Sequence, residues 1–274
     1  MLRQVGGFRE VYIRGTMLLV TFLLYGAALS IGLWRKGVRA AGRQTLSPRP
    51  TDAVPPASVA PSPTLRLLVV GATGGTGRQL VSQALERGYR VTALVRTPAA
   101  LTQVHERLRV VRGDVLDSGS LATAMQDQDA VVSALGHRRF FGPSRIQSDG
   151  TLNVLQAMER HGVTRFVCET SLGLGDSAFR QGLWATFFIT PLILPFYFWD
   201  KARQEHAIAQ SRADWVIVRP GRLTNGPRRG TWRSGLRVGS FIRGSKISRA
   251  DVAAFMLDQV TDDAYLKSTP GVCW

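Results

Sequence analysis

The amino-acid sequence predicts an α/β fold: a doubly wound parallel sheet with helices on both faces. Short apolar segments alternate with stretches of helical periodicity, as expected for strands joined by helices. The segments are apolar almost throughout, which is typical of parallel strands buried on both faces. A glycine-rich turn joins the first segment to the first helix. We expect strands at 65–70, 90–95, 108–111, 129–135, 164–170 and 215–219.

The glycine-rich turn predicts a dinucleotide site. Gly71 allows a tight turn, Gly74 lets backbone N–H groups approach a phosphate, and Gly77 lets the helix pack closely on the strand. The helix N-terminus adds partial positive charge at the same place. The alternative is a purely structural glycine loop. The expected cofactor contacts in the turn are Gly71, Thr73, Gly74, Gly75, Thr76 and Gly77.

Arg96, directly after the second strand, indicates which dinucleotide is bound. A site for NAD places a carboxylate here to bind the ribose 2′-hydroxyl, whereas a 2′-phosphate needs a cation. No carboxylate lies near Arg96 in the sequence, so NADP (NADPH) is favoured over NAD. The alternative is that Arg96 is an ordinary exposed arginine at the end of a strand.

The net charge of +16 over 274 residues comes mainly from two regions. Residues 1–64 hold eight Arg or Lys against two acids, and residues 226–249 hold seven and no acid. Anionic lipid headgroups, a phosphorylated substrate or plain solvation would suit such regions. Nucleic acid is disfavoured, because no recognition pattern accompanies the charge. The two cysteines and four histidines show no disulfide framework and no metal-ligand spacing.

The N-terminal region predicts a membrane anchor. Residues 16–34 are uncharged and close to the length that spans a bilayer as a helix, and Trp34 is followed by four basic residues. A signal peptide and a mitochondrial targeting segment are the alternatives. We therefore expect a tail at 1–15, a single span at 16–34, a basic and then Pro/Ala/Ser-rich linker at 35–64, and a body at 65–274 on the cytoplasmic side.

The carboxyl ends of the predicted strands place further residues around the cofactor, because ligands of such sheets bind beyond these ends. Gly113-Asp114, residues 133–136 and residues 169–171 all lie there. Beyond the turn and Arg96, the expected contacts are Asp114, Val115, Ala134, Leu135, Gly136, Lys201, Pro220 and Gly221.

From residue 65 onward the chain resembles atypical short-chain dehydrogenases/reductases of the NAD(P)H-binding, NmrA-like and biliverdin-reductase-B-like group. The matching marks are the Gly71-x-x-Gly74-x-x-Gly77 turn, Arg96, Gly113-Asp114, Ser171, Lys201-x-x-x-Glu205, residues 218–221 and residues 247–253. The resemblance implies a Rossmann-type fold, an adenine contact at Asp114, and a nicotinamide beside Pro220 and Gly221. Ser248 and Asp251 also predict a helix cap.

Tyr197 and Lys201 have the Tyr-x-x-x-Lys spacing of short-chain dehydrogenases, which puts both side chains on one helix face. The ammonium would lower the pKa of the phenol so that it can pass a proton, and Ser171 would hold the substrate carbonyl. Ser171, Tyr197 and Lys201 are thus the candidate catalytic residues. Against this, many atypical members lack the tyrosine, and Tyr197 lies in an aromatic run where packing is an ordinary role.

The strongly apolar segment 183–196 precedes this pair. It is short and interrupted by proline, so it predicts a lid packed over the active site rather than a span. The alternative is that residues 183–199 contact membrane lipid and admit a lipophilic substrate.

The sequence therefore predicts a membrane-tethered NADPH-dependent oxidoreductase that reduces a carbonyl-like or other electron-poor small molecule. A non-catalytic NADP-binding regulator or assembly factor is the alternative, and a sugar-nucleotide epimerase ranks third.

Overall fold

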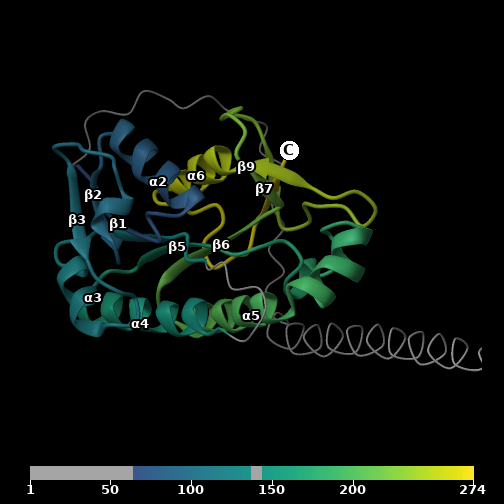
Figure 1. Ribbon diagram of the computed structural model, residues 1–274, viewed down its shortest axis with the longest axis horizontal. Coiled ribbons are helices and arrows are strands. Elements are labelled where there is room, and N and C mark those ends of the chain that lie inside the picture. Colours follow the sequence, from purple (N-terminus) through teal and green to yellow (C-terminus); the bar gives the residue numbers. More distant parts are fainter. Residues whose placement is uncertain (1–63, 137–143) are drawn as a thin grey trace, which may run out of the picture.

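A computed structural model describes residues 64–136 and 144–274. Within these residues one sheet has the strand order β3-β2-β1-β4-β5-β6-β10-β8 (Figure 1). Every neighbouring pair is parallel except β8 and β10. The strands are β1 (Arg66–Val70), β2 (Arg90–Val95), β3 (Leu108–Arg112), β4 (Ala130–Ser133), β5 (Arg165–Glu169), β6 (Asp214–Pro220), β8 (Arg233–Gly235) and β10 (Gly271–Cys273). A separate parallel pair joins β7 (Arg222–Thr224) and β9 (Lys246–Ser248).

Helices cover both faces of the large sheet, as the sequence predicts (Figure 1). One face carries α2 (Gly75–Glu86) and α6 (Arg249–Asp258), which pack on each other. The other carries α3 (Ser118–Met125), α4 (Ile146–His161) and α5 (Pro195–Gln210). Short helical segments are η1 (Pro98–Ala100), η2 (Gly175–Ser177) and the π-helix η3 (Ala185–Ile193).

The two faces of the sheet have separate hydrophobic cores, and β1 contributes to both. Leu67 and Val69 pack with α2 and α6, whereas Leu68 and Val70 pack with α3, α4 and α5. All four side chains are completely buried. The continuous apolar run in the sequence thus reflects a central strand with helices on both sides.

The strand order reverses beside β1, since β2 lies on one side of it and β4 on the other. In open α/β sheets this is where ligands bind, beyond the carboxyl ends of the strands. We call this margin, formed by the carboxyl ends of β1 to β6, the carboxyl edge.

Some predicted strands differ from those observed. The strand expected at 129–135 is β4, Ala130–Ser133, because from Ala134 onward the chain leaves the sheet and passes over Gly71. The antiparallel β8 was not predicted, because three residues are too few to show a strand period. The predicted cap of α6 is confirmed, since the Ser248 hydroxyl accepts a hydrogen bond from the Asp251 N–H.

The segment 183–196 forms η3 and the start of α5, and η3 has no buried residue. The prediction that this segment packs closely as a lid is therefore wrong in this structure, because seven of its large apolar side chains are 41–66% exposed. The predicted span at 16–34, the tail at 1–15 and nearly all of the linker lie outside the described residues. Within 64–136 and 144–274, no helix is both long and apolar enough to cross a bilayer.

Candidate functional site

The glycine turn has the close backbone contacts that the sequence predicts. Gly71 has a φ of +80°, and a Cβ there would lie 2.5 Å from the Ala134 carbonyl oxygen. A Cβ on Gly77 would lie 2.0 Å from the Gly71 carbonyl oxygen. Any side chain at these positions would therefore push α2 away from the sheet or push the β1 turn away from β4.

The turn leads into a helix N-terminus suited to an anion. Gly74 is the N-cap of α2 and offers no side chain to bond the free N–H groups of the first turn. The first turn also contains no acidic residue. Both features fit a phosphate, which would accept these N–H bonds and interact with the positive end of the helix.

The end of β4 meets the glycine turn at the carboxyl edge, and the end of β3 lies on the same edge. The Ala134 N–H donates to the Val70 carbonyl at 2.9 Å, which places Ala134 and Leu135 beside Gly71. Val115 is buried and packs against Gly150 of α4. The Asp114 carboxylate accepts a hydrogen bond from the Leu116 N–H at 3.0 Å, which fixes the turn after β3.

Two arginines lie where the second strand approaches the turn. Arg96 is exposed directly after β2. Arg78, which the sequence analysis missed, donates from Nε to the Thr73 carbonyl at 3.1 Å and from Nη2 to the Ala100 carbonyl at 2.9 Å. Arg78 thus ties the glycine turn to η1, just beyond Arg96. Its signal in the sequence was an arginine directly after the third glycine of the motif.

Tyr197 and Lys201 project from α5 to the carboxyl edge. The Lys201 Nζ lies 5.4 Å from the centroid of the Tyr197 ring and donates to the Glu169 carbonyl at 3.3 Å. The Tyr197 Oη is 4.0 Å from the point where a Cβ on Gly136 would stand. The helix therefore brings the predicted Tyr–Lys pair to the ends of β4 and β5.

Ser171, the third predicted catalytic residue, is half-buried in the segment after β5. Its hydroxyl donates to the Leu172 carbonyl at 3.0 Å. Pro220 accepts a hydrogen bond from the Leu172 N–H, also at 3.0 Å. The end of β6, with Pro220 and Gly221, therefore lies directly beside this segment.

Lys201 is buried among groups that can carry negative charge. Burial lowers the pKa of Lys201, but Tyr197, Cys168, Glu169 and Glu205 outweigh that effect and raise the pKa above its ordinary value. The lysine therefore keeps its charge in an interior where only 2% of its surface is exposed. This charge lies beside the ring of Tyr197.

Glu169 is a second buried titratable group, which the sequence placed around the cofactor without giving it a role. Its carboxylate accepts a hydrogen bond from the Thr76 hydroxyl at 3.1 Å, so it lies under the glycine turn. Burial raises the pKa of this carboxyl, although Lys201, Thr76 and Arg249 oppose the rise. A carboxyl inside a predicted strand gave no signal of this contact, because α2 and β5 are joined only in the folded protein.

Arg249, at the start of α6, lies against the first turn of α2. A Cβ on Gly75 would stand 2.5 Å from the Arg249 Cδ. The guanidinium donates from Nη1 to the Asn225 side chain at 2.6 Å. A cation is thereby held beside the helix terminus at which a phosphate would bind.

A buried ion-pair network supports the ends of β5 and β6. Arg219 donates to both Glu205 oxygens, at 2.9 and 2.7 Å, and to Asp176 at 2.5 Å. The Thr170 hydroxyl donates to Glu205 at 2.7 Å. The network fixes the segment after β5, which includes Ser171, against α5.

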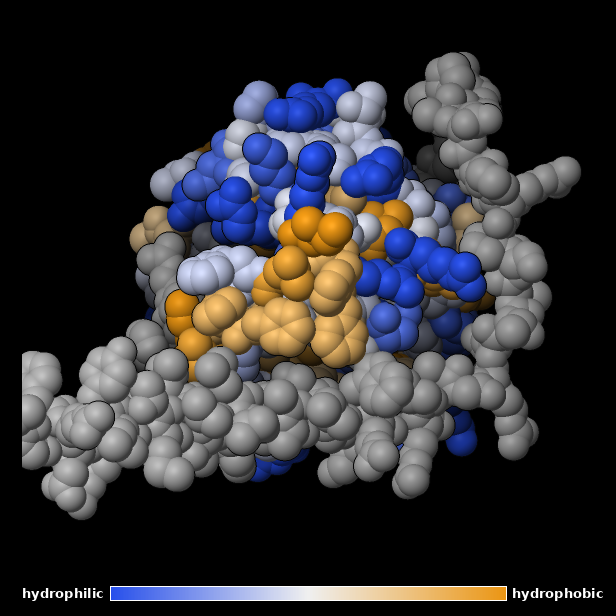
Figure 2. Space-filling view, turned by 90° about the vertical axis from the view of Figure 1, so that its right-hand side faces the viewer, coloured by the Kyte–Doolittle hydropathy of each residue, from blue (hydrophilic) through white to orange (hydrophobic). Residues whose placement is uncertain are grey.

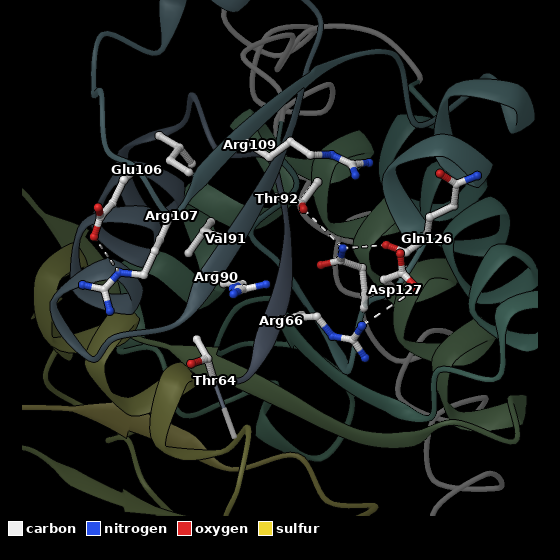
Figure 3. Close-up of a pocket in the computed structure, with 12 residues that line it drawn as sticks. Thr64, Arg66, Arg90, Val91, Thr92, Glu106, Arg107, Arg109, Gln126 and Asp127 are labelled. Atoms are coloured by element: carbon white, nitrogen blue, oxygen red, sulfur yellow. Dashed lines mark hydrogen bonds and ion pairs between the residues drawn. The ribbon is translucent and has the colours of Figure 1, made fainter. Parts of the chain in front are cut away.

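A hollow of about 620 Å³ lies at the opposite end of the strands. Figure 3 shows that charged side chains line much of it, among them Arg66, Arg107 and Arg109. Arg66 and Arg107 lie 3.9 Å from Asp127 and Glu106 respectively, so the lining contains both signs of charge. Because it is at the amino ends of β1, β2 and β3, we do not assign it to the cofactor.

Among the described residues, no group of His, Cys, Asp or Glu is arranged to hold a metal ion. Cys168 and Cys273 are both buried and unpaired with each other.

The chain matches the NAD(P)H-binding family over residues 71–263 and belongs to this family. This match supports the predicted resemblance to atypical short-chain dehydrogenases/reductases, and the fold is an NAD(P)-binding fold of the Rossmann type. The chain is similar to ChuY, an anaerobillin reductase from Escherichia coli O157:H7, at 23% identity and a TM-score of 0.62. That match covers 76% of this chain and 96% of ChuY.

Another solved neighbour is a short-chain dehydrogenase/reductase from Veillonella parvula in complex with NADP. It is 17% identical, with a TM-score of 0.63, and the match covers 77% of this chain and 94% of that one. At these identities both structures show the shared fold alone.

Two curated relatives come from photosynthetic organisms. An uncharacterized chloroplastic protein of Arabidopsis thaliana is 34% identical over 61% of this chain and 62% of its own length. The photosystem II assembly factor Ycf39 of Synechocystis is 35% identical over 38% of this chain and 32% of its own length. The chain thus spans less than two thirds of the length of either relative.

Proposed function

We propose that this protein is an NADPH-dependent oxidoreductase that reduces a carbonyl-like or other electron-poor, lipophilic small molecule. The observation that carries the proposal is the position of Tyr197 and Lys201, which α5 delivers to the edge of the sheet that holds the glycine turn. A buried, charged lysine 5.4 Å from a phenol ring is a costly arrangement that packing alone does not require.

The residues fit a dinucleotide, because two glycines of the turn have no room for a Cβ and the α2 N-terminus has no side-chain cap. Gly71, Gly74, Gly77 and the first-turn N–H groups would hold its phosphates. When bound, NADPH supplies a hydride to the substrate.

The proton would come from Tyr197. As the carbonyl carbon accepts hydride, negative charge develops on its oxygen, and the phenol transfers its proton to that oxygen to give the alcohol. The Lys201 ammonium stabilises the phenolate left behind, which then regains a proton from water. Ser171 would donate a hydrogen bond to the same substrate oxygen and hold it near Tyr197.

NADP is proposed over NAD because cations gather where the 2′-phosphate would lie. Arg96 is exposed after β2, and Arg78 is held by the Thr73 carbonyl of the glycine turn and by the Ala100 carbonyl in the segment that follows Arg96. A guanidinium can bond a phosphate through two N–H groups.

The tether is proposed from the sequence. Residues 16–34 would anchor the chain in a membrane as a single span, with the NADP-binding domain on the cytoplasmic side where its cofactor pool lies.

The second candidate is a non-catalytic NADP-binding regulator or assembly factor. Its support is the resemblance to Ycf39, which is described as a photosystem II assembly factor. The same cofactor edge would then serve to sense NADPH, with no substrate reduced.

Two measurements separate these functions. The first is a fluorescence titration with NADPH and with NADH. The second is NADPH oxidation with a panel of carbonyls and quinones, repeated with Tyr197→Phe. We expect Tyr197→Phe to bind NADPH normally and to lose about 10²- to 10⁴-fold in turnover, the usual contribution of a general acid. An unchanged rate on a confirmed substrate would remove Tyr197 from the mechanism. Tight binding with no turnover on any substrate would favour the regulator.

A further inference from the structure

Ten large apolar side chains are exposed on two neighbouring segments: Phe179, Leu183, Trp184, Phe187, Phe188, Leu192, Ile193, Phe196, Phe241 and Ile242. We call this set the apolar face. Figure 2 shows an apolar area gathered on one side of the molecule, with hydrophilic residues above and beside it. The exposed fractions run from 41% to 72%, which is unusual for large side chains that lie so close together.

The two segments of the apolar face are joined by backbone bonds. Arg180 accepts a hydrogen bond from the Ser240 N–H at 2.9 Å, and Ser240 accepts one from the Gly182 N–H at the same distance. The rings of Phe179 and Phe241 pack edge to face at 6.4 Å. Backbone bonds and ring packing therefore hold the two segments of the apolar face together, close to β8 and η3 in the chain.

The surface around the apolar face is cationic. Arg237 and Arg243 are exposed on the same connection as Phe241 and Ile242, and Lys246 is exposed at the start of β9. Neither 177–199 nor 226–250 contains a single Asp or Glu. An exposed cluster of aromatic and aliphatic side chains bordered by cations and free of acids is the composition that binds anionic lipid surfaces.

We propose that the apolar face docks on an anionic lipid bilayer, with Trp184 and its neighbouring phenylalanines in the headgroup and acyl boundary and the arginines on lipid phosphates. The N-terminal residues that lie outside the described part of the chain favour a lipid bilayer as the partner of this face, rather than a second copy of the chain or another protein. Residues 16–34 form an uncharged apolar stretch of membrane-spanning length. The 29 residues at 35–63 reach about 90 Å when extended, so the face can meet the same bilayer.

The test is a lipid-quenching measurement on the full chain reconstituted in vesicles. The chain has only two cysteines, and both are completely buried, so a thiol-reactive fluorophore can be placed on the apolar face through Trp184→Cys. The matched control is Val104→Cys, because Val104 is 95% exposed just before β3, at the opposite edge of the sheet. The vesicles carry acyl chains with a shallow nitroxide quencher, in phosphatidylcholine with or without phosphatidylglycerol.

We expect the label at position 184 to be quenched at least about threefold more than the label at 104, and more strongly with phosphatidylglycerol. Arg243→Gln and 1 M salt should each reduce the difference, because both weaken the attraction to lipid phosphates. Equal quenching at the two positions would overturn the proposal. So would a label at 184 that is shielded from aqueous iodide but not quenched by lipid, which would assign the face to a second copy or a protein.

A double variant separates docking from misfolding. Phe187→Ser with Phe188→Ser removes two exposed rings, so the fold, followed by circular dichroism and by NADPH binding, should be unchanged while the quenching at 184 falls to the level of the label at 104. Retained quenching in a folded double variant would contradict the proposal. The readout is lipid contact alone, so its failure leaves the proposed reductase activity untouched, and an inactive enzyme would not affect this result.

Discussion

The carboxyl edge buries charged side chains, whereas the apolar face exposes hydrophobic ones. At the carboxyl edge Lys201, Glu169 and Arg219 are each less than 10% exposed, and each has a polar partner. At the apolar face, ten large hydrophobic side chains are exposed. Buried charges cost desolvation, and exposed apolar surface gives up hydrophobic stabilisation. Both regions thus depart from the most stable arrangement, which is the usual mark of a surface or site that serves function.

The largest expected effect comes from adding a side chain where the carboxyl edge is tightest. Gly77→Val would place a Cβ 2.0 Å from the Gly71 carbonyl oxygen. We expect the free energy of unfolding to fall by about 3 kcal/mol and NADPH binding to fall more than about a hundredfold, because α2 must move away from the turn. Chemical denaturation and a cofactor titration measure the two quantities.

Gly119→Ala is the control, since a Cβ there is 3.6 Å from its nearest neighbour atom. It should leave stability equal or slightly raised, because alanine favours a helix. A Gly77→Val variant as stable and as tight-binding as this control would show that the turn is looser than the structure indicates.

The next largest effect is expected on dinucleotide binding, when an arginine of the carboxyl edge is removed. Arg78→Ala removes both the tie between Thr73 and Ala100 and the positive charge at that place. We expect NADPH to bind about tenfold or more weakly while NADH is less affected, because only NADPH carries the 2′-phosphate. Arg109→Ala, whose guanidinium bonds the Thr123 carbonyl instead, is the matched control. An equal loss for both dinucleotides would limit Arg78 to a structural role.

A smaller effect concerns pH. Burial raises the pKa of Glu169, so the folded state holds this proton to a higher pH than the unfolded state does. The Glu169 carboxyl therefore does not affect stability below its pKa in the unfolded state. It destabilises the fold as pH rises from there through its pKa in the folded state. Glu169→Gln should be more stable than the natural protein at pH 8 by on the order of 1 kcal/mol, and this advantage should vanish near pH 4.

For Asp129 we expect the opposite dependence of stability on pH. The hydrogen bond from Arg66 lowers the pKa of Asp129, so its contribution is present above the unfolded pKa and is lost as pH falls through the folded pKa. Asp129→Asn should therefore be less stable than the natural protein at neutral pH and equal to it in acid. Denaturation curves of both variants across pH would show whether the two carboxyls behave with these opposite signs.

The smallest effect is expected on the apolar face. Phe188 is 42% exposed, and Phe188→Ser should change the free energy of unfolding by no more than about 0.5 kcal/mol. Truncating a buried ring such as Phe166 costs about 3–5 kcal/mol. If Phe188→Ser approached that loss, the ring would be packed into the fold and the contrast between the two regions would fail.

The sequence alone predicted the strands β1 to β6 of the sheet, the glycine turn and the spacing of Tyr197 and Lys201, but neither β8 nor β10. These features are local: a buried strand shows as an apolar run, a tight turn needs glycine, and a four-residue spacing fixes one helix face. The family match over 71–263 confirms that this reading of the turn was sufficient to identify the class.

Only the tertiary structure decided which distant residues meet. Glu169 lies under Thr76, 93 residues earlier in the chain, and Arg249 lies against Gly75 although α6 follows every strand of the sheet except β10. The apolar segment 183–196 had the composition of a lid, yet seven of its large apolar side chains are exposed. Burial and contact depend on how elements pack across the sheet, and a local pattern of residues does not carry that information.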